Sequence, residues 1–195
     1  MADITHGTWI KDGKAVDTVY QSSIKVYGRN LLRDTANQSS ADWYTKNSTS
    51  NIETYLGSKT LKTSIAWNNV RYAFSSVAPL VNLTDTYTYS IYVKVTGAES
   101  STLSNSYSIR FFSAATDASG SLTSLNTLSG NDWQRISRSF KFTTNVANQY
   151  PYDQSLRFEL TNNLPDGAYI SFAAMKLEKG TTATNYSLAP EDILN

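Results

Sequence analysis

The feature that most constrains this chain is a period of two in its apolar residues. In the segment Thr86–Val95, apolar side chains fall on alternate positions, at Tyr87, Tyr89, Ile91, Val93 and Val95. Because successive side chains of a β-strand point to opposite faces, this spacing predicts a half-buried strand. We find no segment with the apolar spacing of an amphipathic helix, and the abundant Ser, Thr, Asn, Tyr and Val are poor helix formers. The chain is therefore expected to be all-β.

The same alternation predicts further strands. They are expected at Asn30–Asp34, Thr60–Trp67, Val70–Ser75, Tyr107–Phe112, Trp133–Thr143, Ser155–Thr161 and Ala168–Glu178. In the last strand the apolar phase changes near Ala173 and Ala174, which predicts a β-bulge. About eight strands, each with one apolar face, favour a two-sheet sandwich or a barrel.

The chain is long enough for one sizeable core, and its ends differ from its centre. Residues 1–27 contain a possible hairpin, in which Trp9–Ile10 and Ala15–Tyr20 flank a turn at Lys11–Lys14. We therefore expect an N-terminal extension or anchoring segment at 1–27, a main domain at 28–190 and a linker-like tail at 191–195.

Composition excludes several classes of function. The net charge is +1 and charged residues make up 17% of the chain, so it lacks the basic excess expected of a nucleic-acid binder. It has no cysteine, which excludes disulfides and thiolate chemistry. We see neither a membrane span nor a signal peptide, so synthesis in the cytoplasm is expected.

Few groups in the sequence suit catalysis. The single histidine, His6, lies in the N-terminal segment, and most acidic residues fall in expected loops. Glu159 lies within a strand and near arginines, where an ion-pair partner is commoner than a general acid. We expect no enzyme activity and no catalytic residue. We recognise no motif for a cofactor or metal, although calcium bound by loop oxygens leaves no contiguous pattern.

The polar phases of the strands contain arginine and aromatic side chains. Together they comprise Arg71, Ser90, Tyr92, Lys94, Ser108, Arg110, Phe112, Arg157 and Glu159. If they share one face, it suits a sugar, whose ring stacks on aromatic groups while Arg and Glu bind hydroxyls. A solvated face with Arg–Glu pairs has the same pattern, so periodicity leaves both open. Trp43 and Trp67 are placed at the edge of a cleft, and Trp133 in the core.

Several segments resemble a known family. They are GRNLL at 28–32, YTYSIYVK at 87–94, DWQRI at 132–136 and, most specifically, KLEKGTTATNYSLAPED at 176–192. Residues 28–192 resemble jelly-roll carbohydrate-binding modules, and more narrowly those in tail and baseplate proteins of phages that infect Gram-positive bacteria. The resemblance implies an antiparallel two-sheet β-sandwich of the jelly-roll type, with a glycan on its concave face or at loops along one edge.

The resemblance also implies a role in adsorption. The partners would be a cell-wall polysaccharide of a Gram-positive host and other tail or baseplate proteins, with the chain in the virion and neither nucleic acid nor membrane bound. The expected carbohydrate-binding residues are Tyr92, Arg110, Arg157, Glu159, Arg71, Trp67 and Trp43. Related modules hold calcium through acidic residues in the last strand, but Ala173 and Ala174 stand here, so calcium is disfavoured. Two alternatives stay open: a purely structural virion module and a glycoside-cleaving enzyme.

Overall fold

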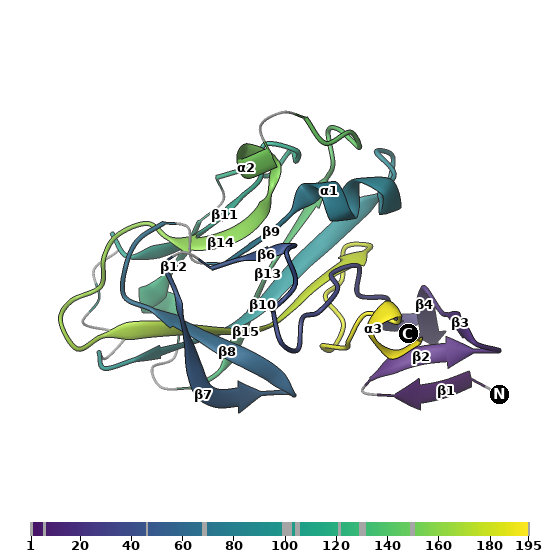
Figure 1. Ribbon diagram of the computed structural model, residues 1–195, viewed down its shortest axis with the longest axis horizontal. Helices are drawn as coiled ribbons and strands as arrows, with labels where there is room; N and C mark the ends of the chain where they lie inside the picture. Colours follow the sequence, from purple (N-terminus) through teal and green to yellow (C-terminus); the bar gives the residue numbers. More distant parts are fainter. Residues whose placement is uncertain are drawn as a thin grey trace.

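The computed structural model describes residues 2–5, 7–45, 47–67, 70–98, 103, 106–120, 122–128, 132–148 and 151–194. In this part of the chain, two five-stranded antiparallel sheets enclose one hydrophobic core (Figure 1). The β10 sheet has the order β13 (Gln134–Lys141), β10 (Thr86–Thr96), β15 (Tyr169–Lys179), β8 (Ser58–Thr63) and β7 (Thr49–Tyr55). The β14 sheet has the order β12 (Leu122–Ser124), β11 (Ser108–Phe112), β14 (Leu156–Leu160), β9 (Val70–Tyr72) and β6 (Trp43–Tyr44). The predicted all-β sandwich is confirmed.

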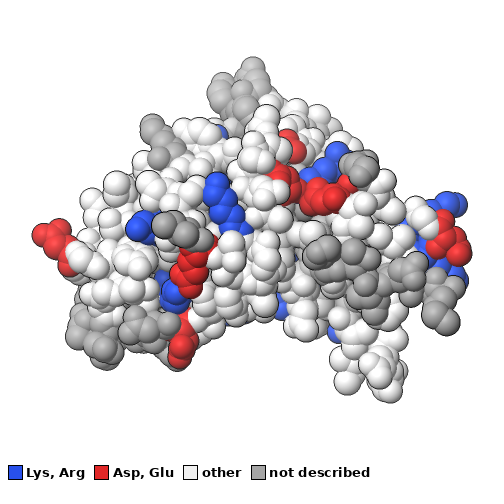
Figure 2. All heavy atoms as spheres, turned by 60° about the horizontal axis from the view of Figure 1, so that its bottom comes forward, with Lys and Arg blue, Asp and Glu red and all other residues white. Residues whose placement is uncertain are grey.

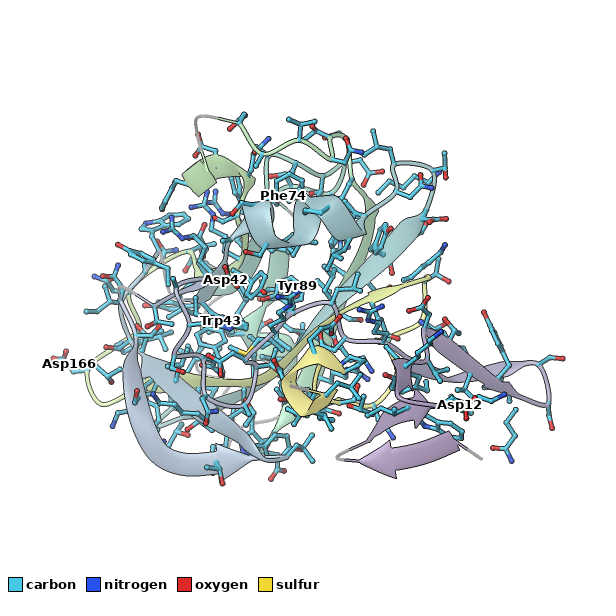
Figure 3. All side chains as sticks on the ribbon, turned by 45° about the vertical axis from the view of Figure 1, so that its right-hand side comes forward. Asp12, Asp42, Trp43, Phe74, Tyr89 and Asp166 are labelled. Atoms are coloured by element: carbon cyan, nitrogen blue, oxygen red, sulfur yellow. The ribbon has the colours of Figure 1, made fainter. Side chains whose placement is uncertain are left out.

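The inward side chains of β10, which the alternation predicted, pack between the two sheets. Its inward side chains, Tyr87, Tyr89, Ile91, Val93 and Val95, are each at most 2% exposed. Tyr89 lies in the middle of the molecule (Figure 3), with its ring centroid 4.8 Å from Phe158 of β14. Large rings that meet across a sandwich bury much apolar surface, which is the main favourable contribution to folding.

The predicted bulge in β15 is confirmed. The register of β15 against β10 shifts between Ser90 and Tyr92, where Ala174 adopts a positive φ of 52°. The extra residue reverses the inward phase, so both Phe172 before it and Met175 after it are fully buried.

Three predicted strands differ from the structure. The strand expected over Thr60–Trp67 is β8, which ends at Thr63. The strand expected over Val70–Ser75 ends at Tyr72, and Phe74 begins the short helix α1 (Phe74–Val77), which caps the core. The strand expected at Asn30–Asp34 does not form. This segment has a backbone hydrogen bond to β15, from Leu31 N–H to the Leu177 carbonyl, and is also held by the Asn30 side chain.

The N-terminal extension folds into two small sheets. β2 (Thr8–Lys11) pairs with β1 (Ala2–Thr5) and with β3 (Lys14–Ala15), so the expected turn at Lys11–Lys14 is present. The expected second arm continues instead into a separate hairpin of β4 (Thr18–Gln21) and β5 (Ile24–Gly28).

The remaining elements are short. They are η1 (Ala78–Leu80), η3 (Leu125–Thr127), α2 (Pro151–Gln154) and α3 (Glu191–Leu194). The segment expected to be a linker-like tail thus forms α3, in which Glu191 pairs with Arg29 and Asp192 accepts a hydrogen bond from the backbone of Asp34. Among the described residues, none of the helices has the length and apolar character that a membrane span requires. On the face shown in Figure 2, basic and acidic side chains are interspersed.

Candidate functional site

The outer face of the β14 sheet gathers the arginines that the sequence singled out. In the strand register, Arg71 of β9 lies opposite Arg157 of β14, which lies opposite Phe112 of β11. Tyr44 of β6 extends this row beyond Arg71, and Glu159 faces Arg110 one step along the strands. We call this surface the Arg–aromatic face. It comprises Tyr44, Trp67, Arg71, Arg110, Phe112, Tyr152, Arg157 and Glu159.

Guanidinium groups and aromatic rings alternate along this face. The Arg71 guanidinium lies 4.0 Å from the ring centroid of Tyr44 and 4.5 Å from that of Tyr152. Arg157 lies 4.4 Å from the same Tyr152 ring and 4.2 Å from Phe112.

Arg110 continues the series, 4.7 Å from the Phe112 ring and 4.6 Å from Trp67. Each guanidinium of the series is thus in contact with two rings. Because each such contact is attractive, the rings and cations fix one another's positions.

One carboxylate lies among these three arginines. Glu159 is 1% exposed, and its Oε1 accepts hydrogen bonds from Nε and Nη2 of Arg110, at 3.1 and 2.5 Å. Nε of Arg157 is 3.7 Å from the same oxygen. Glu159 therefore acts as an ion-pair partner here, as its position in the strand suggested.

Three aromatic side chains of the face remain open to solvent. Tyr44, Tyr152 and Trp67 are 39, 41 and 42% exposed. Beside Trp67 lies an open groove of about 600 Å³, which Tyr107, Asn162 and Asn163 also line. Flat apolar rings next to fixed polar groups are the chemistry that binds the C–H faces and hydroxyls of a sugar.

Trp67 is held in a strained backbone conformation. Its φ is 63°, in the left-handed region that bulky residues rarely adopt. Its backbone N–H donates to the carbonyl of Leu160, and the Asn47 side chain donates to its carbonyl oxygen at 2.8 Å. Strain that the surroundings enforce is frequent at binding sites, because it places a side chain where the relaxed chain would not.

The structure thus brings together five of the seven expected site residues, Trp67, Arg71, Arg110, Arg157 and Glu159. The expectation of a single face that includes Tyr92 is wrong, because β10 belongs to the opposite sheet. Tyr92 points outward there, with its ring 5.2 Å from Tyr55. Trp43 is a second correction, since it is only 7% exposed, packs edge-on against Tyr72 and donates from Nε1 to the carbonyl of Arg33 (Figure 3).

Sequence reasoning missed Tyr44 and Tyr152 as members of this face. Tyr44 lies in a two-residue strand and Tyr152 in a single-turn helix, elements too short to show a period. The only available signal was that Tyr44 follows Trp43, so that one of the two had to face outward in an extended segment.

The outer face of the β10 sheet carries a different aromatic group. Trp133, expected in the core, is only partly buried and stacks on Tyr55 with 4.5 Å between ring centroids. It precedes an edge strand, so one side of its ring has no neighbouring strand to cover it. A groove of about 430 Å³ nearby is lined by Tyr55, Tyr92 and Tyr186. Lys94 of this face is neutralised by both oxygens of Glu53, at 2.7 and 2.9 Å.

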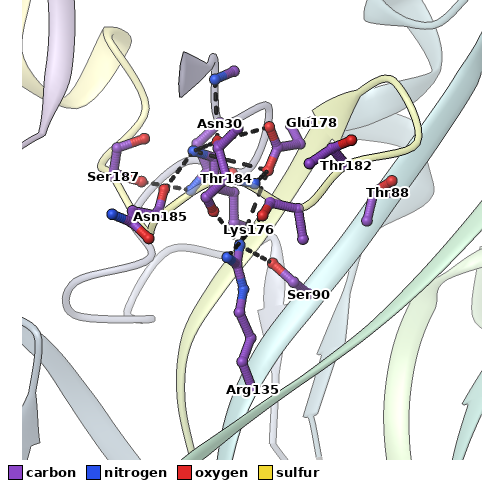
Figure 4. A network of polar contacts seen from close by, with 12 residues as sticks. Asn30, Thr88, Ser90, Arg135, Lys176, Glu178, Thr182, Thr184, Asn185 and Ser187 are labelled. Atoms are coloured by element: carbon purple, nitrogen blue, oxygen red, sulfur yellow. Dashed lines mark hydrogen bonds and ion pairs between the residues drawn. The ribbon is translucent and has the colours of Figure 1, made fainter. Parts of the chain in front are cut away.

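The segment that carries the most specific sequence resemblance forms a buried polar network, which we call the clasp (Figure 4). Glu178 of β15 is fully buried and accepts hydrogen bonds from Lys25 Nζ at 2.8 Å and from the Thr184 backbone at 2.7 Å. Lys176 donates to Thr184 Oγ1 and to the carbonyl of Asn185. The clasp thus ties the β4–β5 hairpin and the C-terminal segment to the sandwich.

The surroundings of Lys176 in the clasp disfavour its positive charge. Burial lowers the pKa of Lys176 to about 8, and the negative charge of Glu178 opposes this effect. Arg135 and Lys25, both positive, lower the same pKa further.

The residues of β15 do not fit a calcium site. Ala173 and Ala174 offer no ligand oxygen from their side chains, and both carboxylate oxygens of Glu178 already accept hydrogen bonds. Lys25 Nζ also binds the carbonyl oxygen of Lys179, so an ammonium group takes up oxygens that a cation would use. Among the described residues, no cluster of three or more His, Cys, Asp or Glu forms. His6 lies outside the described residues.

The fold is a two-sheet antiparallel β-sandwich that is also found in a solved xylanase structure. No protein-family profile and no curated protein sequence matches the chain. Among solved structures, the chain is similar to the family 22 module and GH10 modules of endo-1,4-β-D-xylanase 10B from Clostridium thermocellum, complexed with xylohexaose. It is 12% identical to that chain, with a TM-score of 0.50, over 82% of this chain and 30% of that one.

Two further structures are isolated modules. One is the C-terminal family 22 carbohydrate-binding module of the same xylanase, 13% identical over 80% of this chain and 96% of that one, with a TM-score of 0.46. The other is the CBM22-1 xylan-binding domain of Xyn10C from Paenibacillus barcinonensis, 13% identical over 79% and 96%, with a TM-score of 0.41. At 12% identity, the likeness to the xylanase 10B structure establishes the fold and not the ligand.

Proposed function

We propose that this domain binds a polysaccharide through the Arg–aromatic face and does not cleave it. The observation that carries the proposal is the arrangement of three exposed rings, Tyr44, Tyr152 and Trp67, around guanidinium groups fixed by stacking. Sugar rings stack on such surfaces at little entropic cost, because the aromatic side chains are already held. The fold shared with xylan-binding modules supports a carbohydrate ligand.

The absence of cleavage is part of the proposal. Glycosidases use two carboxyl groups across a cleft, one of which must be free to donate a proton. On the described part of this face, the carboxylate is Glu159, which is buried and bonded to Arg110. It is therefore placed to orient arginines rather than to reach a glycosidic oxygen. We also propose that binding needs no metal ion, since the carboxylate of Glu178 in β15 is already engaged by hydrogen bonds.

We propose, more narrowly, that the polysaccharide belongs to the cell wall of a Gram-positive host and that the domain serves phage adsorption as part of a tail or baseplate. The sequence resemblance over residues 28–192 supports this role. The N-terminal extension would then contact other tail proteins in the virion. Tyr20 and Ile24 of its β4–β5 hairpin, which are 64 and 68% exposed, suit such a contact.

Binding of the fluorescently tagged domain to Gram-positive cells, with and without purified wall polysaccharide as competitor, tests the function. We expect labelling that the polysaccharide competes away and that EDTA leaves unchanged. Trp67→Ala should reduce it at least about tenfold, the scale of one lost stacking contact. Trp133→Ala, which removes the same ring type from the opposite face, is the matched control and should bind normally.

Equal loss in both tryptophan variants would contradict the assignment of the face. New reducing ends in polysaccharide incubated with the domain would show cleavage and overturn the non-catalytic proposal.

The alternative is a purely structural virion module that binds no sugar. It is favoured by one observation: the segment of strongest resemblance forms the clasp, which holds the chain together and lies apart from the Arg–aromatic face. The double variant Tyr20→Ser, Ile24→Ser separates the two. In the adsorption proposal it weakens incorporation into particles but leaves cell labelling intact. Loss of incorporation by a domain that never labels cells would establish the alternative.

A further inference from the structure

The Arg–aromatic face holds more positive than negative charge. Among the described residues of this face, Arg71, Arg110 and Arg157 share one carboxylate, that of Glu159, and its Oε1 accepts hydrogen bonds from Arg110. Among the described residues, Arg71 has neither an ion pair nor a hydrogen bond from its guanidinium group. By contrast, Lys94 on the opposite face is fully paired with Glu53.

Arg157 is the most constrained of the three arginines. It is 3% exposed, and within the described part of the chain its Nε and Nη1 atoms are buried without a hydrogen-bond partner. The rings of Phe112 and Tyr152 lie 4.2 and 4.4 Å from its guanidinium carbon, but an aromatic ring does not replace an oxygen acceptor for its N–H groups. A buried guanidinium with unsatisfied donors is costly, so a structure that keeps one gains when a ligand supplies the acceptors.

Arg71 adds a second cation at the same place. Arg71 and Arg157 lie opposite each other in the pairing of β9 with β14, and both stack on Tyr152. Burial lowers the pKa of Arg71, and the positive charge of Arg157 acts in the same direction. The two like charges therefore repel, with Glu159 as the acidic group beside Arg157 and none beside Arg71 among the residues described.

We propose that the polysaccharide is anionic and that its carboxylate or phosphate group binds between Arg71 and Arg157, beside the ring of Tyr152. This inference rests on the proposed function and narrows its ligand class. Planar guanidinium groups bind carboxylate and phosphate oxygens in pairs of charge-assisted hydrogen bonds, which a neutral xylan-type chain cannot offer. The anion would offset the positive charge of both guanidinium groups and so relieve the repulsion between Arg71 and Arg157.

The test compares one wall polysaccharide in three forms: intact, with its uronate carboxyls reduced to alcohols after carbodiimide activation, and with its phosphodiesters removed by hydrofluoric acid. Affinity is measured by calorimetry against the whole chain. We expect one of the two treatments to weaken binding at least about tenfold, as for a lost charge-assisted pair, and the treatment that does so identifies the group. Binding of the intact polymer should also weaken from about 50 to about 500 mM NaCl.

Arg71→Gln keeps a polar side chain but removes the charge. It should weaken binding of the intact polymer about tenfold. It should leave unchanged the binding of the treated polymer that has lost the recognised anionic group. Arg138→Gln, at an exposed arginine of β13, is the matched control and should match the parent protein.

The outcomes separate the two proposals. If all three forms bind equally and Trp67→Ala still abolishes binding, the anionic ligand is excluded while polysaccharide binding stands. If no form binds, both proposals fall.

Discussion

Arg110 and Glu159 lie opposite each other on β11 and β14, and the carboxylate is buried while the guanidinium side chain is 27% exposed. Removing the arginine takes two hydrogen bonds away from a buried carboxylate, to which Nε of Arg157 lies no closer than 3.7 Å. We therefore expect Arg110→Ala to lower the free energy of unfolding by about 2 kcal/mol, below the range for fully buried pairs because Arg110 is partly solvated. Urea denaturation at pH 7 measures this change as a lower midpoint with an unaltered slope.

A double-mutant cycle isolates the pair from the rest of the face. Glu159→Gln removes the charge, and we expect it to couple with Arg110→Ala by about 1 kcal/mol or more. Strictly additive effects would mean that the two side chains contribute independently, contrary to the contact observed.

Because the backbone at Trp67 is strained, we expect glycine to be more stabilising than alanine at this position, the reverse of the usual order. Glycine normally destabilises a chain relative to alanine, but at a φ of 63° it relieves the clash of the Cβ atom. Trp67→Gly should therefore be more stable than Trp67→Ala by about 1 kcal/mol in thermal or urea unfolding. Both variants lose the ring, so both should lose polysaccharide binding to the same extent.

Leu122 provides the control for this comparison. It is 61% exposed on β12 and has no positive φ. The variant Leu122→Gly should therefore be less stable than Leu122→Ala. The same order at Trp67 as at Leu122 would show that Trp67 is not strained.

The alternation of apolar residues predicted most of the sandwich, because each strand displays its own inward phase. The inward positions of β10, β11 and β14 all follow it, and even the bulge of β15 is visible where Phe172 and Met175 fall out of phase. Alternation assigns a side chain to a face of its own strand only. It carries no information on which sheet that strand joins, and for this reason Tyr92 was grouped with Arg157 although the core separates them.

The alternation predicted only those residues of the candidate site that lie in alternating segments. Arg110, Arg157 and Glu159 lie on strands of five residues, which show a period. Arg71 lies on a strand of only three residues, but the apolar residues around it, Val70, Tyr72 and Phe74, still alternate. Tyr44 and Tyr152 lie in elements of two and four residues that show no such alternation. Trp43 illustrates the other limit. Its neighbour Asp42 is polar, which favours a solvent-facing position, but successive side chains of a β-strand point to opposite faces, so a polar residue does not place the next one in solvent.

Asn30 uses all the hydrogen-bonding capacity of its side chain. It is fully buried, its Nδ2 donates to the carbonyls of Met175 and Ser187, and its Oδ1 accepts from the backbone of Leu32 and Leu177. Asn30→Ala leaves these four backbone groups without partners. We expect a loss of about 3 kcal/mol in the free energy of unfolding, measured by urea denaturation.

Asn30→Asp distinguishes hydrogen bonding from packing, since the two side chains have nearly the same shape. It replaces the two donors by a carboxylate oxygen directed at two carbonyls, so it should be at least as destabilising as alanine. Asn82→Ala, at an exposed asparagine, should cost less than about 1 kcal/mol. A stable Asn30→Asp variant would show that shape alone matters at this position.

The buried Lys176 predicts how stability depends on pH. Its folded pKa of about 8 lies below the ordinary value of 10.5, so between these values the unfolded chain binds more protons and stability rises with pH. Burial raises the pKa values of Tyr27 and Tyr72 from 10.0 to about 12, so the folded chain binds more protons there and stability falls above pH 10. The melting temperature measured from pH 7 to 12 should therefore pass through a maximum near pH 10. The free energy of unfolding should rise by about 1 to 2 kcal/mol before this maximum.

Lys176→Met assigns the rising limb to this residue. The variant keeps an unbranched side chain of similar length without the charge, so its stability should stay level between pH 8 and pH 10 and still fall above pH 10 with the tyrosines. Lys14→Met, at an exposed lysine of β3, should retain the full rise. If the rise persists in Lys176→Met, then another group of the clasp, and not Lys176, loses its proton in this range.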